Sequence, residues 1–132
     1  MRFLIAALLT GLSFAIMDGL INGNVYAAEL MKYYDPIAKH TINVPVALLI
    51  DLFYGIMITG IYKIIFPVLP TGSAMIKGII FGTGMWFFRV VMSVISSWMM
   101  FTIPAKTLIY MLLTGLLEMT VLGIINGLIL KK

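Results

Sequence analysis

The chain has 132 residues, of which 62% are hydrophobic and 11% are charged, and it contains no cysteine. Its mean hydropathy of +1.12 lies far above that of a soluble domain. The lack of cysteine excludes disulfides, thiolate metal sites and thiol catalysis. The net charge of +4 is spread over the chain without a basic cluster. We therefore expect the protein to lie in a lipid bilayer and not to bind a nucleic acid.

Four apolar segments make up most of the sequence. They cover approximately residues 3–23, 46–66, 76–101 and 108–130. Each has about 20 residues or more, the length that a helix needs to cross the hydrocarbon core of a membrane. The sequence therefore predicts an all-α integral membrane protein. We expect a single antiparallel bundle of four transmembrane helices, with an outer loop over about residues 24–44.

The first segment also has features of a secretory signal peptide. It follows Arg2 and precedes the small residues Ala27 and Ala28. However, Asp18 and Asn22 interrupt the apolar run, which is too polar and too long for a simple signal core. We predict that the segment is retained as the first membrane helix, with cleavage before Ala28 as the alternative.

Polar residues and prolines mark the ends of the later segments. Asn43 followed by Pro45 predicts a cap and a first turn for the second helix. Thr71 or Ser73 is expected to cap the third helix, and Pro104 to separate it from the fourth.

Lysine and arginine counts predict the orientation in the membrane. One end of the bundle would carry five basic residues, Arg2, Lys63, Lys77, Lys131 and Lys132. The other end would carry three basic residues and two acidic ones, Lys32, Lys39, Lys106, Glu29 and Asp35. Because the richer side is usually cytoplasmic, we predict an inner-membrane protein with both termini in the cytoplasm.

Each apolar segment carries one ionisable residue at membrane depth, and such groups are costly and usually face a bundle interior. Stepping along antiparallel helices at about 1.5 Å per residue brings Arg89 level with Glu118 and Asp18 level with Asp51. We predict that Arg89 and Glu118 form an ion pair that fixes helix register. The alternative is a gate or a substrate-anchoring arginine.

Two carboxylates at one level cannot both ionise in a low dielectric without a shared proton or a cation. Asn22 lies one turn from Asp18, and Tyr54 lies three residues from Asp51, so each carboxylate has a neutral candidate partner. These four residues are predicted to form either a proton or cation site or a buried hydrogen-bonded dyad.

The first and fourth segments share a glycine pattern. Leu-Leu-Thr-Gly-Leu occurs at 8–12 and 112–116, and the later blocks at 19–23 and 123–127 both begin with glycine and end in Asn-Gly. Glycines spaced by four residues permit close approach of membrane helices. We predict that the first and fourth helices pack closely in opposite directions. The residues expected at this contact are Gly11, Gly19, Gly23, Gly115, Gly123 and Gly127.

Little else in the sequence points to chemistry. His40 is the one histidine and lies in the predicted outer loop, and no nucleotide or protease motif is present. We therefore predict neither an enzyme nor a bound metal or cofactor. Three membrane acids against one base favour a proton- or cation-linked transporter or ion-conducting unit that acts as an oligomer. The alternative is an accessory or scaffold subunit of a larger membrane complex, whose charges serve assembly only.

Overall fold

The computed structural model describes residues 1–131, which are mostly helical and contain no strand. Four long helices are α1 (Arg2–Asn22), α3 (Val44–Ile65), a third composed of α4 (Ala74–Trp86), η3 (Phe87–Val91) and α5 (Met92–Met100), and α6 (Ala105–Ile129). Each is long and apolar enough to cross a membrane. The four predicted apolar segments are thus confirmed as helices. Lys132, which contributed to the charge count, lies outside the described residues.

The segment between α1 and α3 is partly helical. It contains α2 (Val25–Leu30) and the short 3-10 helix η1 (Lys32–Tyr34), and a second 3-10 turn, η2 (Phe66–Val68), follows α3. Asn24 separates α1 from α2, because its side-chain oxygen accepts a hydrogen bond from the Ala27 amide at 2.8 Å. This cap starts a new helix in place of a straight extension of α1.

Two of the predicted helix starts are confirmed. The side chain of Asn43 accepts a hydrogen bond from the Val46 amide at 3.2 Å and caps α3. The hydroxyl oxygen of Ser73 accepts one from the Ile76 amide at 3.3 Å and caps α4. Both caps satisfy amides that have no partner within their own helix.

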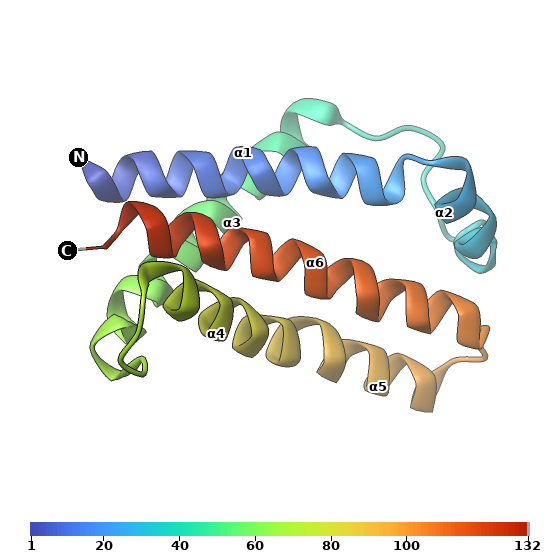
Figure 1. The fold of residues 1–132 in the computed structure, drawn as a ribbon. Coiled ribbons are helices and arrows are strands. Elements are labelled where there is room, and N and C mark those ends of the chain that lie inside the picture. The colour runs from blue at the N-terminus through green and yellow to red at the C-terminus, as the bar shows by residue number, and fades with distance from the viewer. Residues whose placement is uncertain (132) are drawn as a thin grey trace.

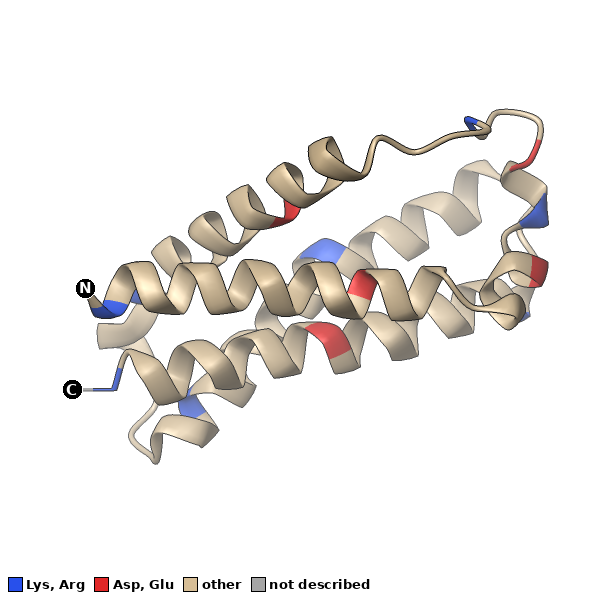
Figure 2. Ribbon diagram, turned by 90° about the horizontal axis from the view of Figure 1, so that it is seen from above, with Lys and Arg blue, Asp and Glu red and all other residues tan. Residues whose placement is uncertain are grey.

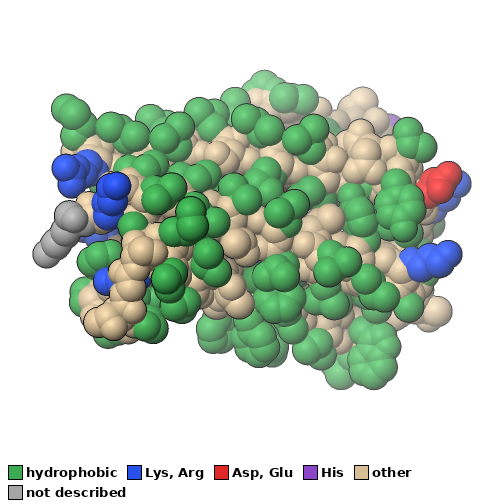
Figure 3. Space-filling model, in the orientation of Figure 1, with side chains coloured by type: hydrophobic (Ala, Val, Ile, Leu, Met, Phe, Trp, Pro, Cys, Tyr) green, Lys and Arg blue, Asp and Glu red, His purple; other side chains and the backbone are tan. Residues whose placement is uncertain are grey.

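The helices associate as two close pairs. α1 packs along α3, and α6 packs along α4, while the contact of α1 with α6 joins the two pairs. Figure 1 shows α1 and α6 side by side, with the two described ends of the chain at the same end of the molecule. Figure 2 shows charged residues at the two ends and near the middle of the helices. Between the ends, Figure 3 shows a surface covered largely by apolar side chains.

Glycines bring the helices of each pair together, but the predicted partners were wrong. A Cβ atom on Gly123 would meet the carbonyl oxygen of Gly78 in α4, and one on Gly11 would lie 2.8 Å from Cα of Leu52 in α3. The other four predicted glycines do not join α1 to α6 either. An added Cβ atom would meet α4 at Gly127 and Val90 of η3 at Gly115. It would meet nothing within 4 Å at Gly19, and only α1 itself at Gly23. The close contacts are therefore within each pair, where Gly55, Gly78 and Gly82 supply the opposite surface.

The contact of α1 with α6 is polar. Asn126 donates a hydrogen bond from its side-chain nitrogen to the hydroxyl oxygen of Thr10 at 3.0 Å, and both residues are fully buried. Thr10 and Asn126 each stand next to a glycine of the shared pattern. The pattern thus identified two helices that touch at similar depth, but the hydroxyl and the amide make the contact and the glycines face elsewhere.

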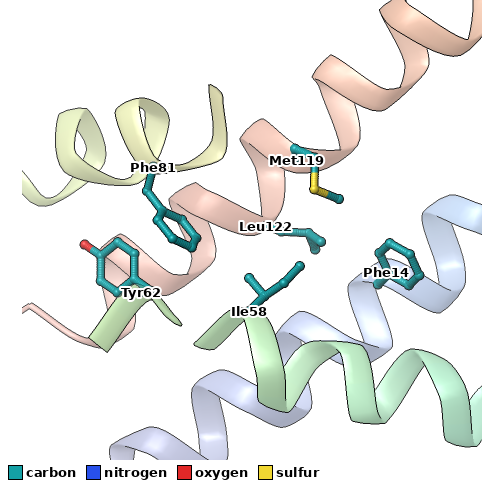
Figure 4. Packing of buried hydrophobic residues seen from close by; sticks show 6 residues of the cluster. All are labelled: Phe14, Ile58, Tyr62, Phe81, Met119 and Leu122. Atoms are coloured by element: carbon teal, nitrogen blue, oxygen red, sulfur yellow. The ribbon is translucent and has the colours of Figure 1, made fainter. Parts of the chain in front are cut away.

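An apolar core lies where all four long helices meet. It contains Phe14 of α1, Ile58 and Tyr62 of α3, Phe81 of α4, and Met119 and Leu122 of α6. Figure 4 shows these side chains converging between the helices. The rings of Tyr62 and Phe81 meet edge to face, with centroids 5.0 Å apart. This core lies nearer the end that carries the termini, and the four charged residues in the middle of the helices lie beyond it, toward α2.

Candidate functional site

Charged residues gather near the middle of the molecule. Figure 2 shows acidic and basic positions on separate helices at this level. Each of α1, α3 and α6 contains a single acidic residue, so the acidic positions are Asp18, Asp51 and Glu118. The basic residue is Arg89, which lies in η3. Near the middle of the helices, three acidic residues thus accompany one basic residue.

Arg89 and Glu118 form an ion pair. Nη1 of Arg89 donates a hydrogen bond to Oε2 of Glu118 at 3.0 Å. The Glu118 side chain is only 6% exposed and that of Arg89 is 31% exposed. It is the one ion pair found among residues 1–131. The second carboxylate oxygen of Glu118, Oε1, is buried and has no hydrogen-bond partner in the described part of the chain.

The guanidinium of Arg89 also lies over two aromatic rings. Its Cζ atom is 4.9 Å from the ring centroids of both Phe14 and Tyr54. These rings come from α1 and α3 and stack on each other, with centroids 4.9 Å apart and planes only 9° from parallel. A planar cation over aromatic faces is a favourable arrangement, and more so away from water. Arg89 therefore links its own helix to the other three.

The segment that carries Arg89 is a π-helix. Phe87–Val91 interrupts the α-helical pattern between α4 and α5 without a proline. Such turns widen a helix and change the direction of its side chains, and they are frequent at functional sites. Here the π-helix is where the third long helix presents its cation to the other helices.

Asp18 pairs with Asn22 and not with Asp51. The Asn22 side-chain nitrogen donates to Oδ1 of Asp18 at 2.8 Å and also to the Asp18 backbone carbonyl at 3.1 Å. No hydrogen bond joins Asp18 to Asp51 within residues 1–131. Tyr54, the predicted partner of Asp51, uses its ring to stack on Phe14 and to support Arg89. Of the four predicted residues, Asp18 and Asn22 thus form a hydrogen-bonded pair, Asp51 is half-buried, and Tyr54 belongs to the aromatic platform.

A cavity of about 360 Å³ brings Asp18 and the ion pair together. Its polar lining consists of Asp18, Asn22, Arg89, Ser93, Tyr110, Thr114 and Glu118, and neither Asp51 nor Tyr54 lines it. The volume fits a small organic molecule or several waters. The cavity thus offers two carboxylates and one guanidinium to whatever enters it.

One side of the cavity is held by Tyr110 of α6. Its hydroxyl donates to the backbone carbonyl of Ile21 at 2.6 Å and accepts from the side-chain nitrogen of Asn24 at 3.1 Å. These bonds tie the end of α1 to α6 next to Asn22. Trp86 ties α4 to α6 in the same region, because its indole nitrogen donates to the Leu112 carbonyl at 2.9 Å.

The charges do not form a multi-carboxylate metal site. Among residues 1–131, no three histidine, cysteine or acidic side chains are close enough together to hold a metal ion. The cavity chemistry consists of single carboxylates, each with a different neighbour. Such groups can exchange protons or pair with a monovalent cation.

The sequence did not assign five parts of this site. Phe14 and Tyr110 look like ordinary membrane-helix aromatics in the sequence, and the π-helix has no residue signature there. Nothing in the sequence assigned Thr114 or Ser93 to this site either.

A comparison of the chain with protein-family models, curated proteins and solved structures finds no significant match. The described residues define a class by fold and site, an all-helical protein with four membrane-length helices and a charged pocket.

Proposed function

We propose that the chain is an antiparallel four-helix bundle in a cell membrane, with both ends on the cytoplasmic side. The largely apolar surface between the two charged ends supports insertion of the bundle into a membrane (Figure 3). The orientation follows from the excess of lysine and arginine at the end that carries the termini. Retention of α1 is supported by its buried face, because Ala6, Ala7 and Phe14 pack inside the molecule. Cleavage of a signal peptide would leave Gly55 and Asn126 without the α1 residues that they contact.

This topology can be tested with reporter fusions. A reporter at the C-terminus should be active in the cytoplasm, and one inserted near His40 should be active outside, since the two positions lie at opposite ends of the bundle. The reverse pattern would overturn the orientation. A mature N-terminus at Ala28 would show instead that α1 is removed.

The function proposed for this bundle is proton-linked transport of a small cation. The observation that carries it is the 360 Å³ cavity, in which Asp18 lies with the Arg89–Glu118 pair. Glu118 is largely neutralised by Arg89, so Asp18 is the cavity carboxylate without a basic partner. In this proposal it binds either a proton or the transported cation, and competition between the two couples their movements.

The transporting unit is proposed to be an oligomer. Four helices enclose little volume, and α3 makes only slight contact with α6. A second copy of the chain would complete the walls of a pathway past Asp18. Asp51, half-buried on α3 outside the cavity, would then be a second acidic group along that pathway.

Replacement of Asp18 by asparagine tests this function. In liposomes with an imposed pH gradient, we expect the wild type to dissipate the gradient faster when tetramethylammonium or K⁺ is present on the opposite side. Asp18→Asn should lower this coupled flux to the level of protein-free liposomes, because the side chain can no longer exchange a proton. The matched control is Asp35→Asn, which removes an exposed aspartate from the outer segment and should leave the flux unchanged.

A second function is favoured by the contacts of Arg89. This residue touches a carboxylate in α6 and stacked rings in α1 and α3, which is the arrangement expected of a purely structural arginine. The chain would then be an assembly subunit of a larger membrane complex. Wild-type liposomes without coupled flux, together with a co-purifying membrane protein, would favour this function over transport.

A further inference from the structure

A second cavity lies at the end of the molecule that carries both termini. Its volume is about 600 Å³, and it is lined by residues of α1, α3, η2 and the end of α6. The apolar walls include Phe3, Phe66, Pro67 and Leu130. The cavity is separate from the central charged cavity, with which it shares no lining residue.

The rim of this cavity is basic. Arg2 and Lys63 line it directly, and the ammonium group of Lys63 lies 5.8 Å from the ring centroid of Phe3. Lys77 of α4 lies close by without lining the cavity, with its ammonium nitrogen 4.4 Å from the ring centroid of Phe66. No acidic residue lines the cavity or pairs with these cations within residues 1–131. Figure 3 shows basic side chains clustered at this end.

Tyr62, whose hydroxyl is buried, also lines this cavity. Tyr62 is 0% exposed and lines the cavity, and its hydroxyl oxygen has no hydrogen-bond partner among the described residues. Figure 4 shows this hydroxyl directed away from the other side chains of the core. An unpaired buried hydroxyl is costly, so its position at a cavity lined by cations points to an acceptor that binds there.

We propose that this cavity binds the headgroup of an anionic phospholipid. The phosphate would accept hydrogen bonds from Arg2, Lys63 and the Tyr62 hydroxyl, and the acyl chains would run along the apolar walls. Basic pockets between membrane helices on the cytoplasmic side suit such headgroups. The inference rests on the membrane placement proposed above and is independent of transport.

Lipid binding to the full-length protein in mild detergent tests the proposal. By native mass spectrometry, phosphatidylglycerol should bind more tightly than phosphatidylcholine. The double variant Arg2→Gln/Lys63→Gln should weaken phosphatidylglycerol binding at least about tenfold, because two cations near the phosphate are lost. The matched control Lys32→Gln/Lys39→Gln removes the same charge at the opposite end and should leave binding unchanged.

The Tyr62 hydroxyl gives a second, sharper test. Tyr62→Phe should weaken phosphatidylglycerol binding several-fold, and in lipid-free detergent it should not lower the melting temperature, since it removes an unpaired polar atom. Thr59 provides the control, because its buried hydroxyl is also unpaired but does not line the cavity. Thr59→Val should therefore leave lipid binding unchanged.

Three results would overturn the proposal. They are equal binding of the two lipids, equal loss of binding in the two double-charge variants, and unaltered binding in Tyr62→Phe. Inorganic phosphate alone should neither bind measurably nor raise the melting temperature. If phosphate did so as strongly as phosphatidylglycerol, the cavity would be a site for free phosphate and not for a lipid. Loss of transport in Asp18→Asn leaves this test unaffected, so the two proposals can fail separately.

Discussion

Replacing Glu118 with glutamine is expected to lower the free energy of unfolding in detergent by about 3 kcal/mol, the lower part of the range for breaking a buried ion pair. The loss arises because Arg89 keeps its charge while its carboxylate partner becomes neutral. The partial exposure of Arg89 places the effect at the lower end of that range, since some of the charge can be hydrated. Replacing Arg89 with methionine should cost a similar amount, because Glu118 is more deeply buried.

The double variant Arg89→Met/Glu118→Gln should recover much of this loss, since the neutral pair leaves no uncompensated charge. Thermal unfolding of the two single variants and the double variant gives the coupling energy directly. Strictly additive losses would contradict the ion pair. Lys106→Met provides the control, because this exposed lysine has no ion-pair partner among residues 1–131 and its replacement should have little effect.

Arg89→Lys distinguishes the two kinds of contact that the guanidinium makes. Lysine keeps the charge and can still reach a carboxylate, but it lacks the planar group that covers the rings of Phe14 and Tyr54. We expect Arg89→Lys to be less stable than the wild type but more stable than Arg89→Met.

The level of a residue along the bundle could be predicted from the sequence, because it depends only on helix length and rise per residue. That reasoning brought Arg89 level with Glu118, and the structure joins these residues at 3.0 Å. It also placed the first and fourth helices in contact at similar depth, where Thr10 meets Asn126. Both results follow from counting along helices that run in opposite directions.

The direction in which each residue faces could not be predicted in the same way. Lipid and protein interior are both apolar, so the hydrophobic pattern of a membrane helix does not mark its buried face as it does in water. For this reason the sequence placed Asp18 and Asp51 at one level but did not show that only Asp18 lines the charged cavity. The π-helix at Phe87–Val91 adds to the difficulty, because it shifts every later side chain around the helix axis.

Glycine packing illustrates the same limit. The repeated pattern of the first and fourth segments suggested that they pack on each other, whereas the structure pairs α4 with α6 through Gly78, Gly82 and Gly123. Any helix with spaced glycines can pack closely on any other, so the pattern names the residues able to make a close contact and not their partners. Connectivity does not identify the partners either. α1 packs on α3 across the long segment 23–43, whereas α3 and α4 make little contact although only residues 66–73 separate them.

Replacing Gly82 with alanine should therefore destabilise the protein by about 1–3 kcal/mol, the usual cost of overpacking a close interface. The added methyl group would meet the backbone of Met119 and would lie 2.9 Å from Cα of Thr120. Neither contact can be relieved by rotating a side chain, so α4 and α6 must move apart. Thermal unfolding in detergent should show a clearly lowered melting temperature.

Gly84 supplies a matched control on the same helix, only two residues away. A Cβ atom there would meet nothing within 4 Å. Since alanine favours the helix over glycine by up to about 1 kcal/mol, Gly84→Ala should leave stability unchanged or raise it. Opposite effects at two neighbouring glycines would establish that α4 packs on α6 through the face that carries Gly82. Equal effects would mean that α4 and α6 do not approach so closely, and the glycine contact described between them would then be wrong.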